Sequence, residues 1–572
     1  MNWPMVLIFT LVLLGVSSLG FWAARWTPGD LTRLQEWGIA GRRFGTIVSW
    51  FLLGGDIYTA YSFMAVPGLI FSAGALGFFA VPYLTLIYPM VFLILPRFWT
   101  VARHRGYVTP ADFVRERFDS RGLALAVALT GILATMPYIA LQMLGIQIIL
   151  SALGLPVEAA LLIAFLLLAG YTYVSGLRAP ALIAVVKDVL IWLVVIVAFL
   201  TIPGRLGGFG HIFSSVPKTK LLLSPSQYSE YSTLVIGSAL ALFLYPHTLT
   251  GMLSTNSRNV VRRNAALLPA YTVLIGLIGL LGYMAVAAGI HGTAAYQTNS
   301  ALPALFAHMF PGWFAGIAFA AICIGALAPA AIMSIAAANL FTRNIYREFW
   351  RPTCSDHEEA KVAKTVSLLV KVGALAFILF FPTELAINLQ LLSNIWIVQT
   401  LPTVFLALYT TWFHRKALAI GWGAGMIVGT ALMLALHFQS SVFPISLLGV
   451  TIPVYAAVAA LVVNLALCCA LTPVYRFVGA DNGEDATTAT DYAAEPVRAR
   501  ARLAPDGQVA AQTLVLVERE ELAPVRVSPS MTRVSERENG TSSLSPSAFI
   551  ARWGANGDQE VHTESLDGHE ST

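Results

Sequence analysis

Several ionisable or hydroxyl-bearing side chains lie inside long apolar segments of this chain. Asp56 follows two glycines, Lys187 and Asp188 are adjacent, His247 follows a proline, and Ser334 lies in an alanine-rich run. Carboxylate, hydroxyl and carbonyl oxygens bind small hard cations, whereas lysine and histidine carry exchangeable protons. Ionisable groups at bilayer depth are costly and usually mark a pathway for a solute or an ion. These residue types therefore indicate ion or solute binding inside a membrane.

The segment at residues 45–73 has the composition of an interrupted helix. Gly54 and Gly55 precede Asp56, and a Pro-Gly pair follows further along the segment. Glycines and a proline free backbone carbonyls, which a discontinuous helix can use to hold a cation or a substrate. The alternative is that Asp56 only caps a kink.

The adjacent pair Lys187 and Asp188 lies near the start of another apolar run. Neighbouring residues on a helix point about 100° apart, so we expect no simple face-to-face pair. Lys187 either extends to the membrane surface, as long basic side chains do, or turns inward. Both alternatives are open at this stage.

The remaining polar positions have structural alternatives. A single buried histidine such as His247 is more typical of a satisfied hydrogen-bonding residue than of a proton carrier. Ser334 offers a hydroxyl toward the interrupted segment, but small residues at this density also form a packing face. Ordinary interface residues are the simplest interpretation of a last group: Lys371, Glu384, Asn388, Gln390, Asn394 and Gln399.

The composition excludes a soluble enzyme or a secreted module. Of the 572 residues, 57% are hydrophobic and only 11% are charged, whereas soluble domains carry roughly 25% charged residues. The net charge of +5 is too small and too scattered for a nucleic-acid interface, and the four cysteines lack metal-ligand spacing. We expect a protein of the lipid bilayer without a cofactor or a nucleic-acid partner.

Apolar runs of about 20 residues, enough to cross a bilayer, occur repeatedly. Thirteen spans are predicted, at 4–25, 45–73, 75–100, 122–153, 157–176, 180–202, 232–253, 265–290, 303–341, 364–382, 387–412, 416–437 and 448–472. Lysine and arginine gather in alternate loops, and the other loops hold only Arg205, Lys218 and Lys220. This asymmetry predicts a multi-pass protein of a bacterial-type inner membrane with an external N-terminus and a cytoplasmic C-terminus.

Four motifs, in order along the chain, are similar to those of one known family. Residues 171–179 match the pattern Y-T-x-x-G-G-L-x-A except at Ser175, which replaces its first glycine. Lys187 and Asp188 stand where the family usually has Thr-Asp.

The other two motifs lie further along the chain. Pro246 and His247 are similar to a Gln-Pro-His element, and residues 331–334 with 340–346 are similar to A-x-M-S-[ST] and L-x-T-x-D-x-Y. With these motifs the chain resembles the sodium:solute symporters over roughly residues 1–477.

The resemblance implies an all-α integral membrane fold of the inverted-repeat (5+5, LeuT-like) type with about 13 transmembrane helices. The chain then divides into an extra N-terminal helix and cytoplasmic loop at 1–44, the transport core at 45–412, two C-terminal helices at 413–477 and a disordered cytoplasmic tail at 478–572. The implied function is secondary active symport of a small organic anion, driven by Na⁺ or H⁺, and not catalysis.

The resemblance also implies a coupling-ion site between two helices. In the family, sodium is held by carbonyls that fall here on Gly55 and Tyr58 and by oxygens that fall on Ala331, Ser334 and Ile335. Ile335 has no hydroxyl where the family has serine or threonine, so a sodium ion would lack one ligand.

A lysine replaces the family's threonine on the helix that borders this site. In a proton-coupled relative of the same fold, a lysine on that helix occupies the sodium position. We therefore expect the Lys187 ammonium to take that position, with Asp56 and Asp188 in the same coupling-ion site. Burial disfavours the charged form of lysine and makes its proton exchangeable, so protonation would replace ion binding.

Within the family, the segments GGDIYTAYSF, PALIAVVKD and AAIMSIAAANLFTRNIY look most like those of the bacterial monocarboxylate permeases. These import lactate, pyruvate, acetate-like acids and, in some cases, alanine. Positive N-terminal ends of discontinuous helices favour such carboxylates. The expected substrate-binding residues are Gly54, Tyr58, Tyr138, Gln142 and His247.

Other interpretations stay open. The substrate is alternatively a proline-like amino acid or pantothenate, carried with sodium. A sensory input domain would need a signalling domain after the last span, and residues 478–572 are too short and too polar for one. An intramembrane hydrolase would need a catalytic constellation, for which Ser334 with His247 has no positional support.

Overall fold

The computed structural model describes residues 2–27, 29–380, 386–447 and 449–493. The longer helical elements are α1 (Trp3–Trp26), α3 (Thr46–Gly55), the π-helix η2 (Tyr61–Ala65), α4 (Val66–Ala73), α5 (Ala80–Arg105), α7 (Arg121–Ala152), α8 (Val157–Ser175), α9 (Arg178–Arg205), α12 (Tyr228–Leu242), α13 (Pro246–Leu253), α15 (Pro269–Ala287), α17 (Gly312–Phe341), α18 (Asp356–Phe380), α19 (Ala386–Ile397), α21 (Arg415–Ala435) and α22 (Ala456–Phe477).

Short elements connect these helices. They are α2 (Leu34–Ile39), η1 (Ala40–Arg42), η3 (Gly74–Phe79), α6 (Pro110–Phe118), α10 (Phe209–Ser215), α11 (Lys218–Leu221), η4 (Pro225–Gln227), α14 (Arg258–Leu267), η5 (Thr298–Ser300), α16 (Ala301–Met309), the π-helix η6 (Thr342–Trp350), η7 (Val398–Thr400), α20 (Leu401–Val404), η8 (Leu406–Leu408), η9 (Ala489–Tyr492) and the strands β1 (Val442–Leu447) and β2 (Val450–Tyr455).

The helix lengths agree with a chain that crosses a membrane many times. In the described residues ten helices are long and apolar enough to span, and counting the bent pair at Lys218–Leu242 and Pro246–Leu253 as one span gives eleven. The predicted spans at 45–73 and 364–382 correspond to the interrupted segment α3–η2–α4 and to α18. The predicted count of about thirteen is consistent with this set.

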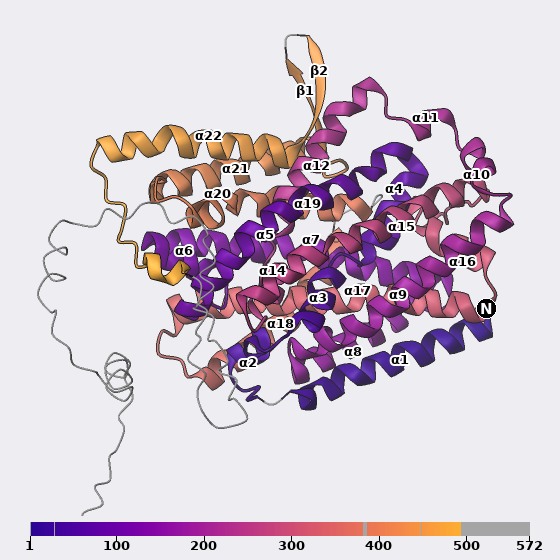
Figure 1. Cartoon of the computed structure of the whole chain (residues 1–572), viewed down its shortest axis with the longest axis horizontal. Coiled ribbons are helices and arrows are strands. Elements are labelled where there is room, and N and C mark those ends of the chain that lie inside the picture. The colour runs from indigo at the N-terminus through magenta and orange to yellow at the C-terminus, as the bar shows by residue number, and fades with distance from the viewer. Residues whose placement is uncertain (1, 28, 381–385, 448, 494–572) are drawn as a thin grey trace, which may run out of the picture. The chain divides into compact units, whose positions relative to one another are not determined.

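The long helices run in nearly the same direction, with α17 in the middle of the bundle (Figure 1). α17 packs against α1, α7, α9 and α18. A Cβ on Gly316 would lie 2.5 Å from the carbonyl oxygen of Met5. Only glycine at this position therefore allows α1 to approach α17 so closely. Almost all of α17 is buried, which makes its alanine-rich run a packing face over most of its length.

Two spans are interrupted, and glycine or proline marks each interruption. α3 ends at Gly55 and helical structure resumes at Tyr61, as the glycine pair predicts. α12 ends at Leu242 and α13 begins at Pro246, with a bend of 44° between the two halves. Proline has no N–H to give to the preceding turn, so a helix is expected to break before it.

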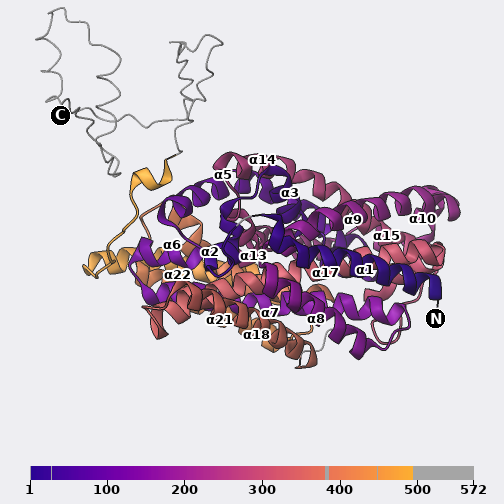
Figure 2. The same cartoon turned by 90° about the horizontal axis from the view of Figure 1, so that it is seen from below.

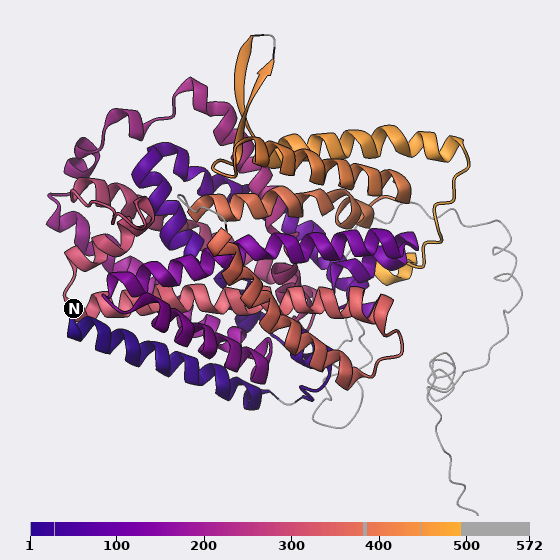
Figure 3. The ribbon, with the colours of Figure 1, turned by 180° about the vertical axis from the view of Figure 1, so that it is seen from behind.

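The predicted span at 448–472 is wrong in its first part. The structure has an antiparallel hairpin of β1 and β2 there, with Val442 opposite Tyr455, and α22 begins only at Ala456. Gly449, with φ of 82°, lies in its turn, and two prolines in the strands disfavour a helix. The hairpin projects from the bundle beside the paired helices α21 and α22 (Figure 3).

The segment after α22 is ordered for some fifteen residues, although we predicted a disordered tail from residue 478. Residues 479–493, here called the C-terminal strap, contact the loop around α6. Arg117 pairs with Asp485, Arg105 pairs with Asp491 at 2.9 Å, and the ring of Tyr492 lies under Arg97 at 4.6 Å. Residues 1–495 form one compact unit, while the rest of the predicted tail, 494–572, lies outside the described residues.

Candidate functional site

The interruption after α3 brings the backbone of this segment close to α15. A Cβ on Gly54 would overlap the ring of Tyr271, so only glycine allows this approach. Beyond the break, the Ser62 hydroxyl donates to the carbonyl of Ile57. Side chains thus take over part of the hydrogen bonding that a continuous helix would supply.

The ammonium group of Lys187 lies against this break. Its Nζ donates to the carbonyl oxygen of Gly55 at 2.6 Å and to that of Tyr58 at 3.0 Å. It also lies 2.8 Å from Oδ1 of Asp188, and the side chains of both charged residues are buried. Lys187 therefore turns inward, and the alternative of a lysine extending to the membrane surface is wrong.

The ion pair between Lys187 and Asp188 corrects our expectation that neighbouring residues would not pair. The lysine side chain is long enough to fold back past its own helix and reach the next carboxylate. The second carboxylate oxygen, Oδ2, accepts a hydrogen bond from the hydroxyl of Tyr271 at 2.7 Å. The pair is thus satisfied on both sides, as a buried ion pair must be to persist.

The first half of the predicted sodium site does not fit sodium in this arrangement. Gly55 and Tyr58 supply the expected carbonyls, but both accept hydrogen bonds from the Lys187 ammonium. Sodium requires oxygen ligands free of a competing cation, and the side chain of Ile335 brings no oxygen from α17. The carbonyl oxygens present here accept hydrogen bonds and therefore suit an ammonium group.

Aromatic rings enclose the ion pair. The Tyr271 ring lies 4.6 Å from that of Tyr58, 5.0 Å from that of Trp50 and 6.2 Å from that of Trp192. The Tyr58 hydroxyl donates to the carbonyl of Tyr271 at 3.0 Å. These contacts fix the tyrosine that orients Asp188. The sequence analysis missed Tyr271, because a tyrosine inside an apolar run gives no distinguishing signal.

A second polar group lies at the other side of the break, where α3 meets α13. Oδ2 of Asp56 is 3.2 Å from Nε2 of His247 and accepts a hydrogen bond from the Thr248 hydroxyl at 3.1 Å. Asp56 Oδ1 and His247 Nδ1 are buried and have no partner in the described part of the chain. Two polar atoms that still need partners are what a binding site for a small polar solute offers.

Tyrosines line this second group. The ring of His247 lies 5.5 Å from that of Tyr138 on α7 and 5.0 Å from that of Tyr245. The Tyr245 hydroxyl is already bound to Asn394 on α19 at 2.7 Å. His247 therefore has hydrogen-bonding contacts with Asp56 on one side and an aromatic wall on the other.

The five predicted substrate residues divide between the polar groups on the two sides of the break. Tyr138 and His247 lie together at Asp56, whereas Tyr58 lies at the ion pair and Gly54 at the ring of Tyr271. The side chain of Gln142 is used internally: it accepts from the backbone N–H of Ala60 at 3.0 Å and donates to the carbonyl of Tyr138 at 3.3 Å. Gln142 thus holds the broken segment in place.

The second half of the predicted coupling-ion site lies in a third polar group. The Ser334 hydroxyl donates to the carbonyl of Ala331 at 2.8 Å and accepts from Ser367 at 3.2 Å. Ser367 in turn receives a hydrogen bond from Lys371 at 3.0 Å. Ala331 and Ser334 are therefore linked to Lys371 of α18 through Ser367. The sequence analysis treated Lys371 as an ordinary interface residue.

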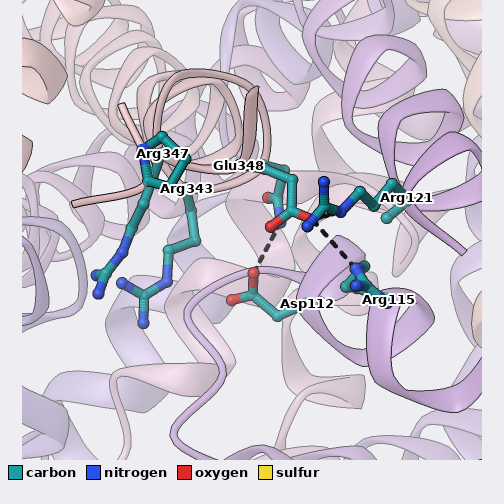
Figure 4. A pocket seen from close by; sticks show the side chains of 9 residues that line it. Asp112, Arg115, Arg121, Arg343, Arg347 and Glu348 are labelled. Carbon is teal, nitrogen blue, oxygen red and sulfur yellow. Dashed lines mark hydrogen bonds and ion pairs between the residues drawn. The ribbon is translucent and has the colours of Figure 1, made fainter. Parts of the chain in front are cut away.

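A cavity of about 320 Å³ lies where α6, α7 and η6 meet (Figure 4). Its charged lining residues are Asp112, Arg115, Arg121, Arg343, Arg347 and Glu348. Glu348 pairs with Arg115 at 3.1 Å and with Arg121 at 2.9 Å. The other two arginines pair with Glu359. Because every guanidinium already has a carboxylate partner, we interpret this network as a clamp between elements.

Comparison with known proteins agrees with the family predicted from the motifs. Residues 37–429 match the model of the sodium:solute symporter family. A "Monocarboxylate transport permease protein" of Rhizobium johnstonii is 52% identical over 470 residues, which cover 81% of this chain and 94% of the relative. An uncharacterised symporter of Bacillus subtilis, YodF, is 35% identical over 75% of this chain and 87% of its own length.

A solved structure has the same fold. It is a Na⁺-coupled sialic acid symporter in a substrate-bound outward-open state, with a TM-score of 0.67, 16% sequence identity, and coverage of 82% of this chain and 98% of that one. The predicted inverted-repeat transporter fold is therefore confirmed, with the β-hairpin as its departure from an all-helical structure. The chain is a membrane transporter and not an enzyme, and it belongs to the sodium:solute symporter family.

Proposed function

We propose that this chain is a proton-coupled symporter that imports short monocarboxylates, such as lactate and pyruvate, by alternating access. The relative from Rhizobium johnstonii, which shares 52% of its residues over most of both chains, is named a monocarboxylate permease. The polar groups at Asp56 and Lys187 lie beside the interrupted helix, where transporters of this architecture bind solutes and ions.

The hydrogen bonds of Lys187 carry the proposal of proton coupling. Its ammonium group donates to the carbonyls of Gly55 and Tyr58 and pairs with Asp188. A proton on Lys187 thus supplies the positive charge that a bound cation would supply at this place. Release of that proton carries the charge away while the lysine side chain stays in the site, so proton binding and release at Lys187 can drive the movement of the broken helix that a bound cation would drive.

The substrate is proposed to bind between Asp56, His247 and Tyr138. The unpartnered Nδ1 of His247 donates to a carboxylate when the imidazole is protonated, and Oδ1 of Asp56 accepts from a hydroxyl group. Lactate carries both groups next to each other. Tyr138 and Tyr245 place aromatic rings beside these polar atoms, and we propose a small 2-hydroxy acid as the solute that fits them best, with 2-oxo acids bound through the carboxylate alone.

The proposal is tested by uptake of labelled lactate, pyruvate, alanine and proline into proteoliposomes, with proton and sodium gradients imposed separately. We expect accumulation of lactate and pyruvate with an inward proton gradient in the absence of sodium. Lys187→Met is expected to keep solute exchange and lose accumulation. Lys218→Met, on α11 with an exposed side chain, is the control and should behave as wild type. Strict sodium dependence of the wild type contradicts proton coupling, and preference for proline contradicts the proposed substrate.

The chain is further proposed to lie in a bacterial-type inner membrane with its N-terminus outside. The N-terminus, α10 and α11 lie at one end of the helix bundle, and α6 lies at the other (Figure 1). The last turn of α5 and α6 together carry four arginines, Arg103, Arg105, Arg115 and Arg117, which supports a cytoplasmic position for this end.

A further inference from the structure

We infer that Lys371 on α18 is a second proton-binding group of the transport cycle, in addition to Lys187. This inference rests on the proposed proton coupling. It adds a residue that neither the family motifs nor the relatives' names point to.

Lys371 is fully buried, and its contacts form a chain of hydrogen bonds that leads to α17. Its Nζ donates to the hydroxyl oxygen of Ser367 at 3.0 Å and lies 3.4 Å from the carbonyl oxygen of the same residue. Ser367 donates to Ser334 at 3.2 Å, and Ser334 donates to the carbonyl of Ala331 at 2.8 Å. This chain ends on the two α17 residues at which the family motif expects a bound cation.

Lys371 differs from Lys187 in having no negative partner. Within the described residues, no carboxylate lies within ion-pair distance of its Nζ, whereas Lys187 has Asp188 at 2.8 Å. An unpaired ammonium in an apolar interior is strongly disfavoured, so such a lysine releases its proton far more readily than a paired one. The two buried lysines therefore differ in their surroundings: Lys187 is paired with a carboxylate, whereas Lys371 is held only by serine oxygens.

The elements around Lys371 supply no hidden counter-charge. α18 packs against α17, α7, α2, α8 and η6, and α7 lies beside it (Figure 2). The charged and titratable groups of these elements contact other partners: Glu36 pairs with Arg43 and Arg178, Glu348 with Arg115 and Arg121, Arg343 and Arg347 with Glu359, Tyr346 with Glu358, Tyr138 with His247, Tyr171 with Phe21 and Tyr173 with Lys364. Glu158 is exposed and Cys323 is a buried thiol.

α17 connects the Lys371 group to the rest of the site. The backbone of α17 also passes the broken segment, because a Cβ on Gly325 would lie 3.6 Å from the carbonyl oxygen of Tyr58. α17 thus touches the Lys187 group on one face and the Lys371 group on another. A positive charge on Lys371 also offsets the negative charge that a monocarboxylate brings into the interior, so symport of one proton and one anion stays neutral overall.

The matched variants are Lys371→Met, which keeps length and apolar volume without the amine, and Lys361→Met, which removes an exposed lysine from the same helix. In proteoliposomes we expect Lys371→Met to keep exchange of labelled lactate at zero gradient and to lose accumulation driven by an inward proton gradient. The exchange rate of the variant should change less steeply with pH than that of the wild type, in which each proton-binding step changes the rate by up to about tenfold per pH unit. Lys361→Met should match the wild type in both assays.

Full proton-driven accumulation by Lys371→Met overturns the inference. If that variant does not fold, Ser367→Ala, which removes the relay but keeps the amine, takes its place. Proton-driven accumulation by Ser367→Ala equal to that of the wild type also overturns the inference.

A second readout is independent of the substrate. In protein with ¹³C-labelled lysine, one side-chain resonance missing from Lys371→Met should titrate between neutral and charged amine over the same pH range in which the exchange rate of the wild type changes. A Lys371 resonance that stays charged through this range overturns the inference. If it titrates as expected while the wild type carries no monocarboxylate, the proposed function is wrong and the proton site stands.

Discussion

The central interaction of the site is an ion pair between two residues that are adjacent in sequence. Lys187 reaches the carbonyls of the broken helix, and Asp188 is held by Tyr271. Both charges are buried, so each is tolerated only because the other is present. The pair therefore links the break in α3 to α9 and α15 through electrostatics.

Removing one charge of this pair should destabilise the protein more than removing both. Asp188→Asn keeps an oxygen for the Tyr271 hydroxyl but leaves Lys187 without its counter-charge, at a cost of about 3–5 kcal/mol. Adding Lys187→Met to this variant should recover part of that loss. The measurement is the melting temperature of the purified proteins in detergent.

The control for this comparison is Asp356→Asn, which breaks the exposed pair with Arg33. Exposed ion pairs contribute less than about 1 kcal/mol, so this variant should melt close to the wild type. If Asp188→Asn melts no lower than the double variant, the two buried charges do not depend on each other as described.

At the scale of elements, the site depends on how closely α15 approaches the interrupted segment. The ring of Tyr271 lies where a Cβ of residue 54 would be, and the same ring places the hydroxyl that orients Asp188. A discontinuous helix therefore serves two purposes here: it exposes carbonyls to Lys187, and it makes room for a tyrosine of α15.

Gly54→Ala should disturb this contact although it adds only one methyl group. The added atom overlaps the Tyr271 ring, and overpacking of this kind costs about 1–3 kcal/mol. We expect a lower melting temperature and a loss of proton-driven uptake. Gly423→Ala in α21, where a Cβ has open space, is the control. It should be neutral or slightly stabilising, because alanine favours a helix by up to about 1 kcal/mol over glycine.

At the scale of the whole molecule, basic side chains of α5 and α6, among them Arg97, Arg105 and Arg117, face the C-terminal strap. The C-terminal strap adds acidic residues there: Asp485 pairs with the buried Arg117, and Asp491 pairs with Arg105. The hydrogen bonds from Thr488 and Arg105 hold the pKa of Asp491 below its usual range, even though burial acts in the opposite direction. Asp491 thus stays ionised at neutral pH and keeps its pair with Arg105.

Labelling of single cysteines tests the proposed orientation. In a Cys469→Ser background, which removes the one exposed natural cysteine among the described residues, Ser214→Cys in α10 should react with a membrane-impermeant maleimide in intact cells. Glu484→Cys in the C-terminal strap should react only after the cells are opened. The reverse pattern contradicts an external N-terminus.

The sequence alone determined the membrane environment, the approximate number of spans and the family. These follow from composition, from apolar run length and from motifs that are local in the chain. The interruptions at Gly54-Gly55 and before Pro246 were also predictable. The backbone freedom of glycine and the missing N–H of proline affect only residues close by in the sequence, so both effects can be recognised without the tertiary structure. Local preference misled us once, at 448–472, where an apolar run adopts a hairpin before the helix.

Only the tertiary structure decided which polar groups meet. Lys187 and Asp188 had two open orientations, and packing against the break selected the inward one. Tyr271 and Ser367 gave no signal in sequence, and Lys371 was interpreted there as an interface residue, because the sequence does not show which distant residue a polar side chain meets. Each of these residues acquires its role from a partner on a distant segment of the chain. The energy of a buried charge depends on that partner and not on the residues next to it in the sequence.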